Sequence, residues 1–247
     1  MAGAEPVFLP AGKATHFFPD LDALDPELLN RTSAFYLCNP SNPQGTVADA
    51  AYLKAALELA RKHDFTLIVD ECYSEIYDKT PPTGILEICA QAFHSLSKRS
   101  SGAGLRSGFC VGETPLIQTF LNLRSFSGAA SPLPVCAAAT ALWNDDAHVE
   151  ENRSLYRAKF DMAEELFGSE FGFYRPEGGF FLWLDVGDGV EAAKRLWTKA
   201  AIRVLPGQYL SVAGPDGINP GDPYIRVALV AEPENSKEAL SRLANSL

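Results

Sequence analysis

The sequence predicts an α/β protein with a mostly parallel sheet, followed by a smaller α/β unit. Three observations lead to this prediction. Short apolar runs alternate with helical patterns in the first half of the chain, polar residues follow the ends of these runs, and a long helical pattern separates them from a second set of strands and helices.

The first two apolar runs are "AFYLC" at 34–38 and "FTLIV" at 65–69, which are typical of strands buried in a parallel sheet. Between them, the pattern of apolar residues from about 47 to 63 predicts a helix whose apolar face is formed by Ala50, Leu53, Leu57 and Ala60. This β-α-β order implies a right-handed parallel crossover.

The next two strands are predicted at "QAFHS" (91–95) and "GFCVG" (108–112). The segment between them is rich in glycine and serine and too irregular for a crossover helix. We therefore expect the strand at 108–112 to run antiparallel to its neighbours.

A long helix is predicted from Asp145 to Gly168, with an apolar stripe of Val149, Tyr156, Phe160, Ala163 and Phe167. We interpret it as a connector between a large domain at 1–145 and a smaller domain at 146–247. The smaller domain is expected to contain strands at 178–186, 202–206 and 224–230, a helix near 190–200 and a final helix from about Glu234.

Composition excludes several classes of protein. Among 247 residues, 21 are Lys or Arg and 31 are Asp or Glu, so the net charge of -10 argues against a nucleic-acid partner. The five cysteines are odd in number and contain no C-x-x-C, which indicates neither a disulfide framework nor a metal site. No run is long enough to cross a membrane and the start lacks signal-peptide features, so we expect a cytoplasmic protein.

Polar motifs follow three of the predicted strands, where ligands collect in parallel sheets. Asn42 lies in "NPSNPQG", Asp70 and Tyr73 lie in "DECY", and Lys98 lies in "SLSK". Each has an ordinary explanation if taken alone: a turn residue, a helix cap or a surface lysine. Together they supply an amine that can form a Schiff base, an acid for a ring nitrogen and hydrogen-bond donors for a phenolic oxygen, and Arg106 adds a cation for a phosphate. Pyridoxal 5′-phosphate requires each of these groups.

The four ordered motifs "NPSNPQG", "DECYSEIY", "SLSKRSSGAGLRSG" and "YIRVALV" resemble the fold-type I pyridoxal-phosphate-dependent aminotransferases of class I/II. The resemblance implies that Lys98 binds the cofactor covalently and transfers the catalytic proton, and that Asp70 protonates the pyridine nitrogen. It assigns the ring oxygen to Tyr73 and Asn42. Gln44 replaces the threonine most common in this family.

The same resemblance implies roles in binding. The phosphate is assigned to Ser95, Ser97 and Arg106, and the substrate α-carboxylate to Arg226, with Asn42 also near the substrate. For Arg226 the alternative is an exposed cation on a strand. The small-molecule partners would be an amino acid and a 2-oxo acid.

A more specific resemblance, to the succinyldiaminopimelate aminotransferases of lysine biosynthesis, rests on "WNDDAHVEENRSLYRAKF" and "NPGDPYIRVALV". It implies transfer between N-succinyl-LL-2,6-diaminopimelate and 2-oxoglutarate. Val69 stands where these proteins have serine before "DECY". An aspartate- or alanine-type aminotransferase, or a non-catalytic domain that binds the cofactor, would use the same core motifs.

The beginning of the chain departs from the family. Between Met1 and Arg31 we find no glycine-rich helix start, no ring-stacking aromatic residue and no arm toward a partner subunit, and "AGAEPVFLP" looks like a strand from the middle of the large domain. We therefore expect this chain to correspond to the carboxyl-terminal portion of such an enzyme, which when full length would be a homodimer.

Overall fold

A computed structural model of the protein describes residues 3–88, 90–128, 130–214 and 216–247. Leu24–Arg157 together with Glu177–Gly179 form one compact unit. The described residues before Leu24, Ala158–Pro176 and Phe180–Leu247 form the other. One of the points at which the chain passes between the units, Arg157–Ala158, lies inside a helix. The division into domains at residue 145 stays a prediction.

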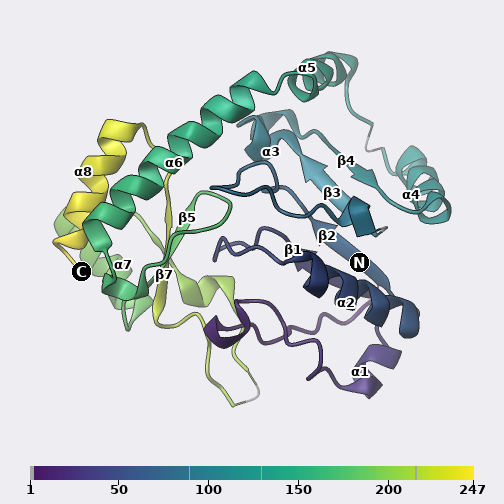
Figure 1. Ribbon diagram of the computed structural model, residues 1–247, viewed down its shortest axis with the longest axis horizontal. Coiled ribbons are helices and arrows are strands. Elements are labelled where there is room, and N and C mark those ends of the chain that lie inside the picture. Colours follow the sequence, from purple (N-terminus) through teal and green to yellow (C-terminus); the bar gives the residue numbers. More distant parts are fainter. Residues whose placement is uncertain (1–2, 89, 129, 215) are drawn as a thin grey trace. The chain divides into compact units, whose positions relative to one another are not determined.

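The unit built around Leu24–Arg157 contains a four-stranded sheet of order β1-β2-β3-β4 (Figure 1). Its strands are β1 (Ala34–Cys38), β2 (Thr66–Asp70), β3 (Gln91–Ser95) and β4 (Gly108–Val111). The first three are parallel to one another, and β4 is antiparallel to β3. The predicted α/β class, the mostly parallel sheet and the antiparallel last strand are therefore confirmed.

Helix α2 (Ala50–Lys62) makes the crossover between β1 and β2. It begins after Asp49, whose side chain accepts a hydrogen bond from the amide of Tyr52 and so satisfies one of the open donors at the helix start. Its buried face is formed by Leu53, Ala56, Leu57 and Ala60. Ala50, at the start of the predicted stripe, is half-buried.

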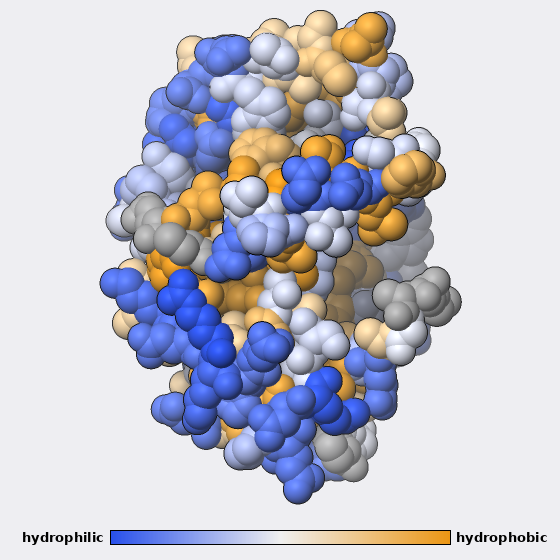
Figure 2. All heavy atoms as spheres, turned by 90° about the vertical axis from the view of Figure 1, so that its right-hand side faces the viewer, coloured by the Kyte–Doolittle hydropathy of each residue, from blue (hydrophilic) through white to orange (hydrophobic). Residues whose placement is uncertain are grey.

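The remaining helices of this unit are short or lie at its surface: α1 (Pro26–Asn30), α3 (Leu96–Arg99), α4 (Thr114–Phe126), α5 (Leu133–Trp143), and the 3₁₀ helices at Ile85–Ile88 and Ala103–Leu105. All residues of α4 are described and none is buried. On the side where Figure 1 places α4, Figure 2 shows apolar side chains at the surface. Helices α4 and α5 were not predicted.

Helix α6 (Ala147–Phe167) confirms the helix predicted at 145–168, and the boundary between the two units at Arg157–Ala158 lies inside it. Its interpretation as a connector between domains stays a prediction. The predicted stripe is confirmed because each of its five members is buried: Val149, Tyr156, Phe160, Ala163 and Phe167. Gly168 adopts a φ of 55°, a left-handed conformation that glycine tolerates and that ends the helix.

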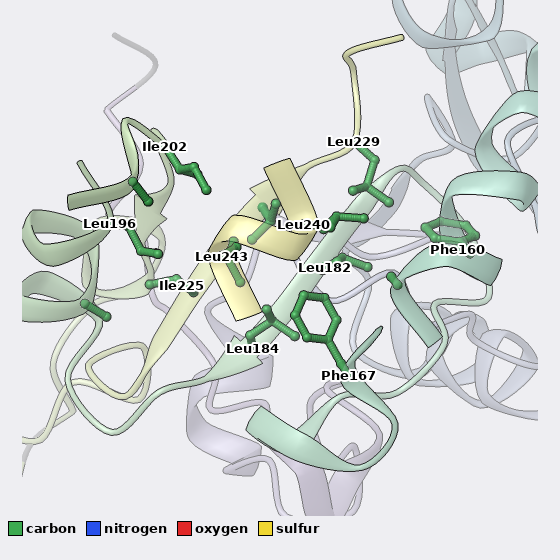
Figure 3. Packing of buried hydrophobic residues seen from close by; sticks show 14 residues of the cluster. Phe160, Phe167, Leu182, Leu184, Leu196, Ile202, Ile225, Leu229, Leu240 and Leu243 are labelled. Atoms are coloured by element: carbon green, nitrogen blue, oxygen red, sulfur yellow. The ribbon is translucent and has the colours of Figure 1, made fainter. Parts of the chain in front are cut away.

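The second unit contains a three-stranded antiparallel sheet of order β5-β7-β6. Its elements are β5 (Phe181–Asp185), α7 (Gly189–Ala200), β6 (Leu205–Pro206), β7 (Tyr224–Ala228), α8 (Pro233–Ala244), and the 3₁₀ helices at Lys13–Thr15, Glu170–Gly172 and Gly207–Leu210. Side chains from α6, both long strands, α7 and α8 form its core (Figure 3). Phe160, Phe167, Leu182 and Leu184 are among the most deeply buried.

Two predicted strands differ from the structure. The strand expected at 202–206 is only Leu205–Pro206, because the amide of Ile202 still bonds to the carbonyl of Leu196 and completes the end of α7. Residues 3–10 form no strand. Val7 and Phe8 are exposed there, and a strand needs a neighbour to take up its backbone hydrogen bonds.

Four of the cysteines are free thiols, namely Cys38, Cys72, Cys110 and Cys136, while Cys89 lies outside the described residues. Across the described chain, every helix is too short or too polar to cross a membrane.

Candidate active site

The loop after β1 is closed by its own hydrogen bonds. The hydroxyls of Ser41 and Thr46 lie 2.8 Å apart, and the amide of Thr46 donates to the Ser41 hydroxyl at 3.1 Å. Gly45, at a φ of 72°, turns the chain back toward α2. These contacts hold "NPSNPQG" in one conformation, so that Asn42 has a defined place at the carboxyl end of the sheet.

Asn42, Tyr73 and Lys98 meet at this edge although they come from three different strand ends. The side-chain amide of Asn42 donates to the Tyr73 hydroxyl at 3.3 Å. The Lys98 amine lies over the Tyr73 ring, 5.8 Å from its centroid. Tyr73 is buried and Lys98 is half-buried.

Asp70 ends β2, next to Cys38 of β1 in the parallel register. One oxygen of its carboxylate accepts a hydrogen bond from the Cys72 amide at 3.0 Å. Burial and then the carboxylate of Asp70 raise the pKa of Cys38 to about 12. Burial and a hydrogen bond with Asp70 likewise raise the pKa of Cys72 to about 12, against a small opposing effect of Lys98.

These two thiols surround the Asp70 carboxylate and were not among the predicted site residues. A signal was present, since Cys38 directly precedes "NPSNPQG" and Cys72 lies inside "DECY". Because their raised pKa values keep them protonated, they surround Asp70 with neutral groups rather than with further charge.

Ser95 and Ser97 lie at the start of α3, the one-turn helix that carries Lys98. Ser95 is its N-cap and accepts a hydrogen bond from the Ser97 amide at 3.1 Å, and the two hydroxyls are 2.8 Å apart. The Ser95 hydroxyl also donates to the carbonyl of Ser107 at 3.4 Å. The two serines are therefore brought together at the end of β3.

Arg106 follows the 3₁₀ helix Ala103–Leu105 and is exposed, with a left-handed φ of 51°. Its guanidinium donates to the Ala103 carbonyl at 3.2 Å. The neighbouring residue Ser107 is joined to Ser95, so the backbone of Arg106 is near the serines, while its side chain folds back on its own turn.

Arg226 belongs to the other unit. It lies on β7, opposite Trp183 of β5 and Leu205 of β6. Its guanidinium lies over the ring of Phe181, 4.4 Å from the centroid. Arg226 is half-buried in this sheet, and its assignment to a substrate carboxylate stays a prediction.

The residues gathered at the sheet edge fit pyridoxal 5′-phosphate. They offer the amine of Lys98, the half-buried carboxylate of Asp70, a phenol that already accepts a hydrogen bond, and two hydroxyls at a helix start. In the described part of the chain, no group of three or more His, Cys, Asp or Glu side chains could hold a metal ion.

Comparisons with known proteins show the family of the chain. The family described as "Aminotransferase class I and II" matches residues 1–243. A transaminase of Streptomyces rimosus, "4-dedimethylamino-4-oxo-anhydrotetracycline transaminase OxyQ", is 36% identical over 84% of this chain and 58% of its own length. An "LL-diaminopimelate aminotransferase" of Dehalococcoides mccartyi is 29% identical over 99% of this chain and 64% of its own length.

Among solved structures, an aminotransferase from Neisseria meningitidis matches with a TM-score of 0.88 and 38% identity. The match covers 93% of this chain and 61% of that one. The chain thus spans 58% to 64% of the length of the two curated relatives.

Proposed function

This chain belongs to the class I and II aminotransferases, and we propose that it serves pyridoxal-phosphate-dependent transfer of an amino group between an amino acid and a 2-oxo acid. The observation that carries the proposal is the meeting of Asn42, Tyr73 and Lys98 at the carboxyl edge of the sheet, close to Asp70. An amine, an acid and a polarised phenol in one place match the demands of this chemistry better than a surface lysine or a helix cap would.

Pyridoxal 5′-phosphate supplies, when bound, an aldehyde that condenses with amines and a ring that withdraws electrons. Lys98 would attach to this aldehyde and, once displaced by the substrate amine, would take and return the proton at the substrate Cα. The amine lies over the buried Tyr73 ring, 5.8 Å from its centroid.

Asp70 would hold a proton on the ring nitrogen, because its carboxylate carries the charge opposite to that of the protonated ring. The amide of Cys72 fixes its orientation. Tyr73 and Asn42 would bind the ring oxygen, and a phenol that accepts a hydrogen bond from Asn42 is a stronger donor through its own O–H.

Ser95 and Ser97 would bind the phosphate together with Arg106, whose guanidinium would leave the Ala103 carbonyl to do so. Arg226 would bind the substrate α-carboxylate through a two-pronged contact that lysine cannot make. A bidentate contact with the α-carboxylate would fix the orientation of the bound substrate.

For the substrate we favour N-succinyl-LL-2,6-diaminopimelate with 2-oxoglutarate as the amino acceptor, a step of lysine biosynthesis. The segments "WNDDAHVEENRSLYRAKF" and "NPGDPYIRVALV" support it, and so does the similarity to the LL-diaminopimelate aminotransferase of Dehalococcoides mccartyi. Aspartate- or alanine-type transfer is the alternative. A homodimer of the whole protein is part of the same proposal.

Mass spectrometry can test the assignment of Lys98. Incubation with pyridoxal 5′-phosphate followed by borohydride should attach a pyridoxyl group to the peptide that contains Lys98. Lys98→Met should abolish this label, whereas Lys62→Met, which removes an exposed lysine of α2, should leave it unchanged. Recovery of the label on a different lysine would refute the assignment.

The acid and the substrate need separate assays. Asp70→Asn should retain the fold and lose most turnover, by roughly 10²-fold or more, because an amide cannot hold a proton on the ring nitrogen.

With the whole protein, transfer from N-succinyl-diaminopimelate should exceed transfer from aspartate or alanine. A preference for aspartate or alanine would move the function to the alternative.

A further inference from the structure

The helix that carries Lys98 cannot be stable by itself. Helix α3 has only four residues, Leu96–Arg99, and one turn of helix is unfavourable in water without tertiary contacts. The placement of the Lys98 amine therefore depends on what holds this turn. Leu96, which is fully buried, fixes the beginning of the helix.

Arg99 holds the other end. Its side chain is only 4% exposed, and its Nε donates to Glu75 at 2.7 Å, while one terminal nitrogen donates to Asp146 at 2.6 Å. The other terminal nitrogen donates to the carbonyls of Leu142 at 2.7 Å and Asp145 at 3.4 Å. One buried guanidinium thus joins α3 to the loop after β2, the end of α5 and the start of α6.

Only arginine can make this set of contacts. The guanidinium carries five N–H donors in a rigid plane, whereas a lysine amine carries three on a flexible stem. The carbonyl of Leu142 lies at the end of α5, where it also accepts a hydrogen bond from the amide of Asp145 at 3.4 Å. The face of the guanidinium also lies over Trp143, 5.0 Å from the ring.

Two further contacts support the same connection from α6. The His148 ring lies 2.9 Å from the hydroxyl of Ser100 and, through its other nitrogen, 2.9 Å from Asp145. Ser100 is the residue at which α3 ends. The turn that carries Lys98 is therefore held from α6 at two consecutive residues, Arg99 and Ser100.

We propose that Arg99 is a positioning residue for amino-group transfer: the hydrogen bonds of its buried side chain to Glu75, Leu142 and Asp146 fix the one-turn helix that places the Lys98 amine over Tyr73. Arg99 itself touches neither Tyr73 nor the proposed cofactor groups in the described contacts. The inference rests on the proposed role of Lys98, but the positional effect on Lys98 can be measured without cofactor.

The first experiment uses the 247-residue chain without cofactor. Arg99→Met removes every donor and keeps an apolar side chain of similar length. Hydrogen exchange of the amides at 96–100 should accelerate by roughly tenfold or more, because several charge-assisted bonds are lost. The rate at which an amine-reactive ester labels the Lys98 amine should differ from that of the wild type as well. Exchange rates in β1 and β2 should stay within about twofold of the wild-type rates.

A milder pair of substitutions covers the case in which Arg99→Met does not fold. Glu75→Gln combined with Asp146→Asn retains Arg99 and removes both charged acceptors, and Asp146 is 89% exposed, so folding should persist. Exchange at 96–100 should still rise, by less than in Arg99→Met. Glu151→Gln, which removes an exposed carboxylate from α6, is the control and should match the wild type.

The second experiment uses the protein loaded with pyridoxal 5′-phosphate. The double variant should lower kcat about tenfold or more at nearly constant KM and shift the pH midpoint of the visible absorbance band, since a displaced amine affects chemistry rather than substrate binding. Unchanged exchange and labelling at Lys98 in both Arg99→Met and the double variant would overturn the inference. If exchange rises but borohydride does not attach the pyridoxyl group to Lys98 in the wild type, the connection through Arg99 stands and the proposed function fails.

Discussion

Replacing Glu71 with alanine should destabilise the unit built around Leu24–Arg157 by about 3 kcal/mol. Glu71 lies directly after Asp70, and its side chain is only 3% exposed. One carboxylate oxygen accepts a hydrogen bond from the Ile85 amide at 2.7 Å, and the other lies 2.9 Å from Nε2 of His94. A buried carboxylate thus joins the site loop to β3 and to the 3₁₀ helix Ile85–Ile88.

The magnitude follows from these two bonds. A buried amide left without an acceptor costs about 1–3 kcal/mol, and a lost bond to a charged group costs about 1.5–3 kcal/mol. Because one carboxylate makes both bonds, the two costs overlap, so we expect about 3 kcal/mol rather than their sum. Glu71→Gln keeps an oxygen for the Ile85 amide and should cost about 1 kcal/mol.

Urea unfolding followed by circular dichroism measures both variants, and a thermal melt should show a fall of roughly 6–12 °C for Glu71→Ala. Glu58→Ala, which removes an exposed carboxylate from α2, is the control and should lie within about 0.5 kcal/mol of the wild type. A Glu71→Ala protein as stable as the control, or equal losses for the alanine and glutamine variants, would refute the reasoning from the Ile85 bond.

Two further predictions concern the core and the thiols. Phe160→Ala should cost about 3–5 kcal/mol by cavity formation, whereas Phe126→Ala, at a side chain that is 92% exposed, should cost little; equal effects in urea unfolding would contradict the packing described. Cys38 and Cys72 have pKa values near 12, so their rate of reaction with iodoacetamide should rise about tenfold per pH unit between pH 8 and 11 and should stay far below that of the exposed Cys136. The contribution of their protonated thiols to the free energy of unfolding should be lost as the pH rises from about 9 toward 12. Rapid labelling of Cys38 or Cys72 in the native protein at pH 8 would contradict their burial.

Local sequence patterns were sufficient to predict most of the strands and the long helix α6. The apolar runs at 34–38 and 91–95 coincide with β1 and β3, and the stripe of α6 is buried as predicted. The antiparallel β4 was also predicted, because the Gly/Ser-rich connection excluded a crossover helix. Each of these predictions depends on side-chain periodicity or on the length of a connection, and both are properties of the sequence itself.

Elements whose formation depends on contacts with other segments could not be predicted in this way. The strand at 202–206 shortens because the end of α7 takes the Ile202 amide, and residues 3–10 form no strand without a partner. Helix α4 escaped prediction because its apolar residues are spread around the helix instead of lying on one buried face.

The sequence by itself determined which residue types are available to the candidate site: Asn42, Asp70, Tyr73 and Lys98 follow strand ends in a parallel sheet, and this order is enough to predict that they lie at one edge. Only the tertiary structure decided how they are held. The bond from Asn42 to Tyr73 spans 31 positions, and the bond from Arg99 to Asp146 spans 47. Such pairs form when helices and strands pack, and a buried charge finds its partners through that packing rather than through any spacing along the chain.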